Sequence, residues 1–286
     1  MRWQGHKESS NVEDRRAGGP GGRRAGLGLG TIAIAVVAAW LFGVDPRMVM
    51  GLLEGVETVT GSSTQQGPAP KPTDETGRFV SVVLASTEET WSQLFAQGGQ
   101  TYQPPKLVLY SGRIDTACGL GAAASGPFYC PGDQRLYIDL SFFELMRERL
   151  GAPGDFAQAY VVAHEVGHHV QNLLGTMAQM ERARARVSGS QHNALSVRLE
   201  LQADCYAGVW ANHSQQARNW LERGDIEEGL GAASAVGDDR IQKQSQGVVV
   251  PDAFTHGSSA QRVRWFRAGL DSGRVSQCDA FSARTP

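Results

Sequence analysis

Two histidines and a glutamate lie close together in one apolar segment, in the order His164-Glu165-Val166-Gly167-His168. In a helix, His164 and His168 leave the same face one turn apart, so both imidazoles can bind one metal ion. Glu165 lies about 100° round the helix and can reach water at that ion without being a ligand. Burying these groups without a partner would be costly, which favours a metal site over the alternative, a polar stripe facing solvent.

A third ligand is needed, because a catalytic zinc site has three protein ligands and an open position. Glu200 and Asp204 are four residues apart in a second helical segment and can point together at the first helix. We predict that Glu200 binds the metal and that Asp204 accepts a hydrogen bond from one histidine ligand, which fixes its tautomer. A solvent-facing pair of acids is the alternative.

Two other residues near these segments are not predicted to be ligands. Glu181 lies in a charged run that is expected to be solvated. His169 lies about 140° from the face of His164 on a helix, so it is expected beside the ligands or at the surface.

His256 is a second candidate catalytic residue beside Glu165, and it stands just before a helix-start signal at Ser258. An imidazole in this position can stabilise the oxyanion of a tetrahedral intermediate. A histidine in a surface loop is the alternative, and the sequence does not decide between the two.

These residues predict metal-assisted hydrolysis of a peptide bond. Zinc lowers the pKa of its bound water towards ~7, and Glu165 passes the water's proton to the leaving amine. The segment 135–140 is expected to pair with an extended peptide as an edge strand and present its carbonyl to the metal. Two alternatives stay open: a non-catalytic, membrane-tethered binding module with a structural metal, and a metal-dependent hydrolase of a non-peptide amide.

The elements that position these residues are visible as capping signals and hydrophobic spacing. A capping box at Ser86 predicts a helix to residue 97. Alternating apolar residues predict strands at 106–110 and 135–140. Further helices are expected at 141–151, 155–174 and 194–211, with helix starts at Asp225 and Ser258. A few strands ahead of a mostly helical remainder indicate an α+β fold with a small sheet.

The N-terminal region carries a candidate transmembrane anchor. Residues 25–44 contain no charge and span about 30 Å as a helix, the thickness of a bilayer core. Basic residues upstream favour a cytoplasmic tail at 1–24, with the rest of the chain outside the cytoplasmic membrane. A cleaved signal peptide is the alternative. Residues 45–77 are expected to be a flexible linker to a globular domain at 78–286.

Charge and cysteine content limit the partners. The 286 residues carry 27 basic and 29 acidic side chains, so no field for nucleic acid is expected. The expected partners are a protein or peptide substrate outside the cytoplasm and a lipid bilayer through residues 25–44. Disulfides persist outside the cytoplasm, and of three connectivities we favour Cys118–Cys130 with Cys205–Cys278. Metal-binding cysteines are the alternative.

Longer motifs accompany these residues. They are Met1–Gly5, Ser9–Arg16, Gly126–Pro131, Tyr137–Phe142, His164–His168, Glu200–Asp204 and His256–Trp265. Together they resemble the bacterial neutral zinc metallopeptidase family of membrane-anchored proteins. The resemblance implies a zincin-like fold, arranged as in thermolysin-like enzymes, with two histidines on one helix and a glutamate on a later one. It implies one zinc ion on His164, His168 and Glu200, with Glu165 as the base.

Overall fold

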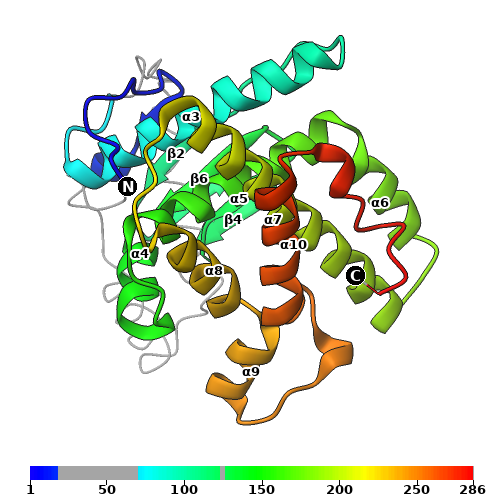
Figure 1. Ribbon diagram of the computed structural model, residues 1–286. Helices are drawn as coiled ribbons and strands as arrows, with labels where there is room; N and C mark the ends of the chain where they lie inside the picture. The colour runs from blue at the N-terminus through cyan, green and yellow to red at the C-terminus, as the bar shows by residue number, and fades with distance from the viewer. Residues whose placement is uncertain (19–69, 123–125, 286) are drawn as a thin grey trace, which may run out of the picture. The chain divides into compact units, whose positions relative to one another are not determined.

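A four-stranded sheet contacts the helix that carries the two histidines (Figure 1). The computed structural model describes residues 1–18, 70–122 and 126–285. Its strands are β1 (Val12–Asp14), β2 (Lys106–Tyr110), β3 (Arg113–Thr116), β4 (Gly119–Ala122), β5 (Phe128–Cys130) and β6 (Arg135–Asp139). The sheet order is β1-β2-β6-β5, with β5 antiparallel to β6 and the other pairs parallel, and β3 and β4 form a separate hairpin. The strands predicted at 106–110 and 135–140 are confirmed.

β6 lies in the interior of this sheet. It pairs with β2 on one side and with β5 on the other, and Leu136 and Ile138 are fully buried. The prediction that segment 135–140 offers a free edge to a peptide is therefore wrong, because both rows of its backbone hydrogen-bonding groups already have partners. Within the described residues, the edge strand on this side is β5, which pairs with β6 alone.

Helices make up most of the globular unit. They are α3 (Glu75–Gln97), α4 (Ser141–Leu145), α5 (Asp155–Leu173), α6 (Thr176–Arg184), α7 (Ser190–Arg218), α8 (Asp225–Ala235), α9 (Asp238–Gln246) and α10 (Ser259–Ser272), with short helical turns at Arg16–Gly18, Met146–Leu150, Pro251–Ala253 and Val275–Gln277. The long helix predicted from Asp155 is α5, and the predicted starts at Asp225 and Ser258 open α8 and α10. The α+β class is confirmed.

No described helix has both the length and the apolar character needed to cross a bilayer. The transmembrane anchor predicted at residues 25–44 lies outside the described residues.

α7 packs against both α5 and α10 in the core, and Figure 1 shows the three helices side by side. Glycines allow the closest of these contacts. A Cβ at Gly208 would lie 2.0 Å from the Phe266 carbonyl oxygen, and one at Gly269 would lie 1.9 Å from the Cys205 carbonyl oxygen. The backbones of α7 and α10 therefore touch at these two positions, which fixes α7, the carrier of Glu200, within the core.

α3 begins earlier than predicted. The helix starts at Glu75, and the Asp74 side chain caps it by accepting a hydrogen bond from the Gly77 amide at 3.0 Å. Ser86 and Thr87, predicted to open the helix, are buried inside it and donate to carbonyls three residues earlier at 2.7 Å. These bonds satisfy both hydroxyls within a helix, so burial of the surrounding apolar face overrides the local start signal.

The first sixteen residues belong to the same compact unit as residues 70–286. β1 pairs with β2, and the ammonium group of Met1 lies 2.8 Å from Asp155 Oδ2 and 3.2 Å from Asp225 Oδ2. Residues 1–16, predicted as part of a separate tail at 1–24, therefore belong to the same unit as the domain predicted from residue 78, and that unit also includes residues 70–77. The rest of the linker predicted at 45–77 lies outside the described residues. A three-residue strand that pairs across more than ninety positions leaves no local pattern that predicts it.

Both favoured disulfides are present. Cys118–Cys130 closes a short loop ahead of β6, with a Cα–Cα distance of 5.8 Å. Cys205–Cys278 ties the C-terminal segment to α7 across 73 residues, with a Cα–Cα distance of 5.5 Å. Because all four cysteines are bonded in pairs, the alternative of metal-binding cysteines is wrong.

Candidate metal centre and active-site cleft

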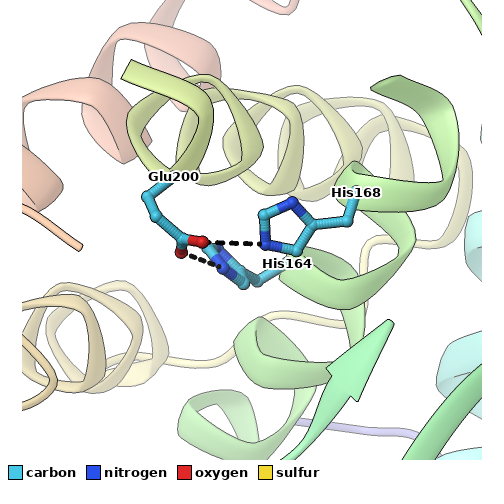
Figure 2. Close-up of side chains that lie close together, drawn as sticks. All are labelled: His164, His168 and Glu200. Carbon is cyan, nitrogen blue, oxygen red and sulfur yellow. Dashed lines mark hydrogen bonds and ion pairs between the residues drawn. The ribbon is translucent and has the colours of Figure 1, made fainter. Parts of the chain in front are cut away.

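His164 and His168 on α5 and Glu200 on α7 bring three potential ligands together, as Figure 2 shows. Glu200 Oε2 lies 3.1 Å from His164 Nε2, and Glu200 Oε1 lies 3.4 Å from His168 Nε2. The ligand atoms of the three side chains all lie within 4.8 Å of one another. One ion can therefore contact an atom from each.

The close approach of α5 and α7 depends on Gly167, inside the histidine motif. A Cβ at this position would lie 2.9 Å from the Ala203 carbonyl oxygen and 3.1 Å from the Ala203 Cα. The two helices therefore meet backbone to backbone at this point. Glu200, about one turn before Ala203, is thereby brought within reach of both histidines. This role of Gly167 was not predicted.

The structure places Asp204 behind His164, where it is fully buried. Asp204 Oδ1 lies 2.9 Å from His164 Nδ1 and also accepts a hydrogen bond from the Tyr160 hydroxyl. Arg262 on α10 donates to Asp204 Oδ2 through Nε at 2.8 Å and to Oδ1 through Nη2 at 2.9 Å. Neither Tyr160 nor Arg262 was predicted. Tyr160 lies one turn before His164 on α5, a spacing that could have found it, whereas Arg262 lies 58 residues from Asp204. The network holds His164 so that its Nε2 faces Glu200.

His168 has a separate partner, Gln171. Its Oε1 atom lies 2.9 Å from His168 Nδ1, and its Nε2 atom donates to the Leu199 carbonyl at 2.7 Å and to Gln202 Oε1 at 3.1 Å. Because an amide oxygen only accepts, His168 Nδ1 carries the hydrogen and Nε2 is free to bind a metal. Gln171 was not predicted, although its position three residues after His168 on one helix is a signal that could have found it.

Neighbouring charges make this site favourable for a cation. Burial lowers the pKa of His164, but Asp204 and Glu200 raise it overall to about 10. Burial raises the pKa of Glu200, yet the imidazoles of His168 and His164 hold it well below its ordinary value. For Asp204, the Arg262 guanidinium likewise outweighs burial and lowers the pKa. Both carboxyl groups are therefore ionised, and positive charge between them and the imidazoles is stabilised.

Glu165 lies beside the three potential ligands and lines the same cavity. Its side chain is buried, and its Oε2 atom makes no hydrogen bond to the described residues. Burial raises the pKa of this carboxyl group above its ordinary value. Since buried oxygens without a partner are rare, Glu165 is a group kept available for water or a ligand.

The cavity has a volume of about 510 Å³ and is lined by both polar and apolar side chains. The polar lining residues include His164, Glu165, His168, Glu200, His256 and Arg262, and the apolar ones include Phe128, Phe142, Val161, Met177, Leu199, Val236 and Ile241. Phe128 and Tyr129 belong to β5, so the edge strand borders the cavity. The predicted ligands and both predicted catalytic residues therefore share one cleft.

His256 enters this cleft from the loop before α10. Its Nδ1 lies 3.2 Å from Oδ1 of Asp238, the first residue of α9. Asp238 Oδ2 also accepts the backbone amides of Thr255, His256 and Gly257 at 2.7, 2.7 and 3.0 Å, so one carboxylate fixes the whole turn. The hydrogen bond to Asp238 raises the pKa of His256 against the opposing effect of burial. Asp238 was not predicted, since it lies 18 residues from His256.

Glu181 and His169, which were not predicted to be ligands, do not belong to the group formed by His164, His168 and Glu200. Glu181 is 71% exposed and pairs with Arg184. His169 is only 1% exposed, so the surface position that we considered for it is wrong. It contacts Tyr129 and the Gln103 carbonyl instead of Glu200, and burial lowers its pKa.

Comparison with known proteins places these features in a family. The chain is 52% identical over 289 residues to the protein YpfJ of Escherichia coli K12, a match that covers 98% of this chain and 99% of that protein. It is 39% identical over 262 residues to the protein Rv2575 of Mycobacterium tuberculosis H37Rv, which covers 86% and 85% of the two chains. No solved structure matches. A family model described as "Putative neutral zinc metallopeptidase" matches residues 1–281, and the chain belongs to this family.

Proposed function

We propose that this protein is a zinc-dependent peptidase in which Glu165 is the general base. The observation that carries the proposal is the convergence of His164, His168 and Glu200 on one cleft. Beside them lies a Glu165 oxygen that has no hydrogen-bond partner among the described residues. The Nδ1 atoms of both histidines are held by other side chains, the usual arrangement in sites where Nε2 binds a metal.

The donor set fits zinc. Two imidazole nitrogens and one carboxylate are ligands that zinc accepts in catalytic sites, which keep a further position open. Among the described residues, no fourth histidine, cysteine, aspartate or glutamate joins this group, as a closed structural site would require. When bound, zinc supplies Lewis acidity, which activates water and polarises a carbonyl.

Two protein side chains move or stabilise charge during the reaction. Glu165 accepts a proton from the attacking water and delivers it to the leaving amine, and its raised pKa makes it a stronger base. His256, whose pKa is raised by its hydrogen bond to Asp238, donates a hydrogen bond to the oxygen that gains negative charge. His256 and Glu165 line the same cleft, which supports a division of roles between them.

An extended peptide is the substrate that this cleft fits. β5 borders the cleft and pairs only with β6 among the described strands, so its outer side can accept a substrate strand through backbone hydrogen bonds. This strand takes the role that the sequence assigned to segment 135–140. The two disulfides support a substrate outside the cytoplasm, where such bonds persist.

The first test is Glu165→Gln in the full-length chain, which keeps β1 in the sheet. We expect zinc content to stay at one ion per chain and cleavage of a diverse peptide pool to fall by about 10²- to 10⁴-fold, because only the base is lost. Glu181→Gln, at an exposed position, is the matched control and retains the wild-type rate. An unchanged rate in Glu165→Gln would contradict the proposal.

The second test separates the metal ligands from the base. Glu200→Gln removes the charged ligand, so we expect elemental analysis to show loss of zinc as well as of cleavage. Wild-type protein that binds zinc tightly but cleaves no peptide would favour the binding module with a structural metal. Cleavage of non-peptide amides alone would identify the other alternative.

A further inference from the structure

β5 is a short strand that borders the cleft, so something must fix its distance from the metal-binding histidines. Its three residues pair with β6 alone among the described strands. Cys130, at its end, is tied to Cys118 by a disulfide. The part that lines the cleft, Phe128 and Tyr129, lies before this tie and needs its own attachment to α5.

The Tyr129 hydroxyl makes that attachment. It lies 3.1 Å from His169 Nδ1 and accepts a hydrogen bond from Asn172 Nδ2 at 3.0 Å. His169 Nε2 lies 2.7 Å from the Gln103 carbonyl, which can only accept, so Nε2 carries the ring hydrogen. In the neutral ring Nδ1 is then an acceptor, and the Tyr129 hydroxyl donates to it. Every group in this cluster has a defined donor or acceptor role.

His169 follows the metal-binding His168 directly in α5. Successive residues of a helix point about 100° apart, so one helix presents a metal ligand on one face and an anchor for β5 on the next. His169 is buried between the rings of Tyr129 and Tyr102, at centroid distances of 5.4 and 5.8 Å. Because His168 and His169 are neighbours on one helix, a shift of α5 along its axis would move both of them together.

We propose that Tyr129, His169 and Asn172 are positioning residues that hold β5 at the distance from the metal centre at which a peptide strand can pair with it. The inference rests on the proposed peptidase function and deepens it, because it assigns substrate recognition to extended peptides that reach β5. The three residues act on substrate binding. They neither bind the metal nor transfer the proton during hydrolysis.

The chain offers a matched pair of variants for the test. Tyr129→Phe keeps the ring and removes the hydroxyl that bonds to His169 and Asn172. Tyr102→Phe removes a buried hydroxyl that has no hydrogen-bond partner among the described residues, from a ring that contacts the same histidine. Each variant is measured as the full-length zinc-loaded protein with a peptide of six or more residues and with a blocked dipeptide too short to reach β5.

For Tyr129→Phe we expect KM of the long peptide to rise about 3- to 10-fold, the size expected for lost hydrogen bonds. The kcat, the zinc affinity and the KM of the dipeptide should stay within about twofold of wild type. Hydrogen exchange at the β5 amides should become faster than in Tyr102→Phe, whose kinetics should match the wild type.

The positioning role would be overturned by an unchanged KM for the long peptide, by an equal KM rise for the dipeptide, or by the same effect in Tyr102→Phe. A fall in zinc affinity in Tyr129→Phe would instead assign the cluster to the metal centre and overturn it as well. Wild-type protein without zinc-dependent cleavage would overturn the peptidase function and the substrate role together, so the two failures are distinguishable.

Discussion

Gly167→Ala tests whether backbone contact between α5 and α7 sets the metal site. The new methyl carbon would lie 2.9 Å from the Ala203 carbonyl oxygen and 3.1 Å from the Ala203 Cα. Carbon atoms in contact are normally about 3.5–4.0 Å apart, and backbone atoms cannot rotate away as a side chain can. The two helices must therefore separate by roughly 0.5–1 Å.

This displacement is carried to the proposed metal ligands, because Glu200 lies one turn before Ala203 on α7. Its carboxylate oxygens are 3.1 Å from His164 Nε2 and 3.4 Å from His168 Nε2. Metal–ligand distances tolerate changes of only about 0.2 Å. We expect zinc affinity to fall about 10- to 100-fold, the range seen when a group that orients a ligand is lost.

The same substitution should also lower stability without metal. Overpacking a close contact costs about 1–3 kcal/mol. Replacing glycine by alanine within a helix returns about 1 kcal/mol. We therefore expect the free energy of unfolding of the metal-free protein to be unchanged or to fall by up to about 2 kcal/mol.

Zinc affinity is measured by competition with a chromophoric chelator, and stability by urea unfolding in EDTA. Gly231→Ala is the matched control, because Gly231 lies within α8 and a Cβ there would meet no atom of the described residues within 4 Å beyond its chain neighbours and its own helix backbone. The control should gain about 0.5–1 kcal/mol of stability and keep its zinc affinity. If Gly167→Ala binds zinc as tightly as the control, the close helix contact does not position Glu200 and the reasoning is refuted.

Three further predictions concern the supports of the site. Asp238→Asn removes the negative charge of the group whose hydrogen bond raises the pKa of His256. The imidazolium should then be lost at lower pH, and the alkaline limb of the kcat/KM profile should shift to lower pH; an unmoved limb would exclude His256 as the proton-bearing group. Arg262→Met removes the guanidinium partner of the buried Asp204 carboxylate and should lower the free energy of urea unfolding by about 3–5 kcal/mol, whereas a loss below 1 kcal/mol would show that this ion pair is dispensable. Cys278→Ser removes the disulfide to Cys205, which spans 73 residues, and should lower the free energy of urea unfolding by about 4 kcal/mol under oxidising conditions. An unchanged free energy would show that the bond is absent in solution.

The ligand-bearing helices could be predicted from the sequence because their chemistry is encoded locally. His164 and His168, like Glu200 and Asp204, are four residues apart, and helix geometry alone puts each pair on one face. The convergence of the two pairs needed only that both helices enter one core. Their apolar neighbours already indicated this.

Two of the supporting residues, Arg262 and Asp238, could not be predicted in the same way, because their partners lie far away along the chain. Arg262 reaches Asp204 across 58 positions and Asp238 reaches His256 across 18. Neither contact follows from helical or strand periodicity. The start of α3 was missed for a related reason: Ser86 and Thr87 are hydroxyl residues of the kind that open helices, but here they are buried within one.

The sheet also constrains membrane attachment, for which residues 25–44 were predicted from composition alone. β1 pairs with β2, the Asp14 amide donates to the Pro70 carbonyl at 3.0 Å, and Arg16 pairs with Asp74. These contacts join residues that precede the predicted anchor to residues that follow it. Strands on opposite sides of a bilayer cannot share backbone hydrogen bonds, so a cytoplasmic N-terminus with an external domain does not fit this pairing. Any attachment through residues 25–44 must leave β1, β2 and the cleft on the same side of the membrane.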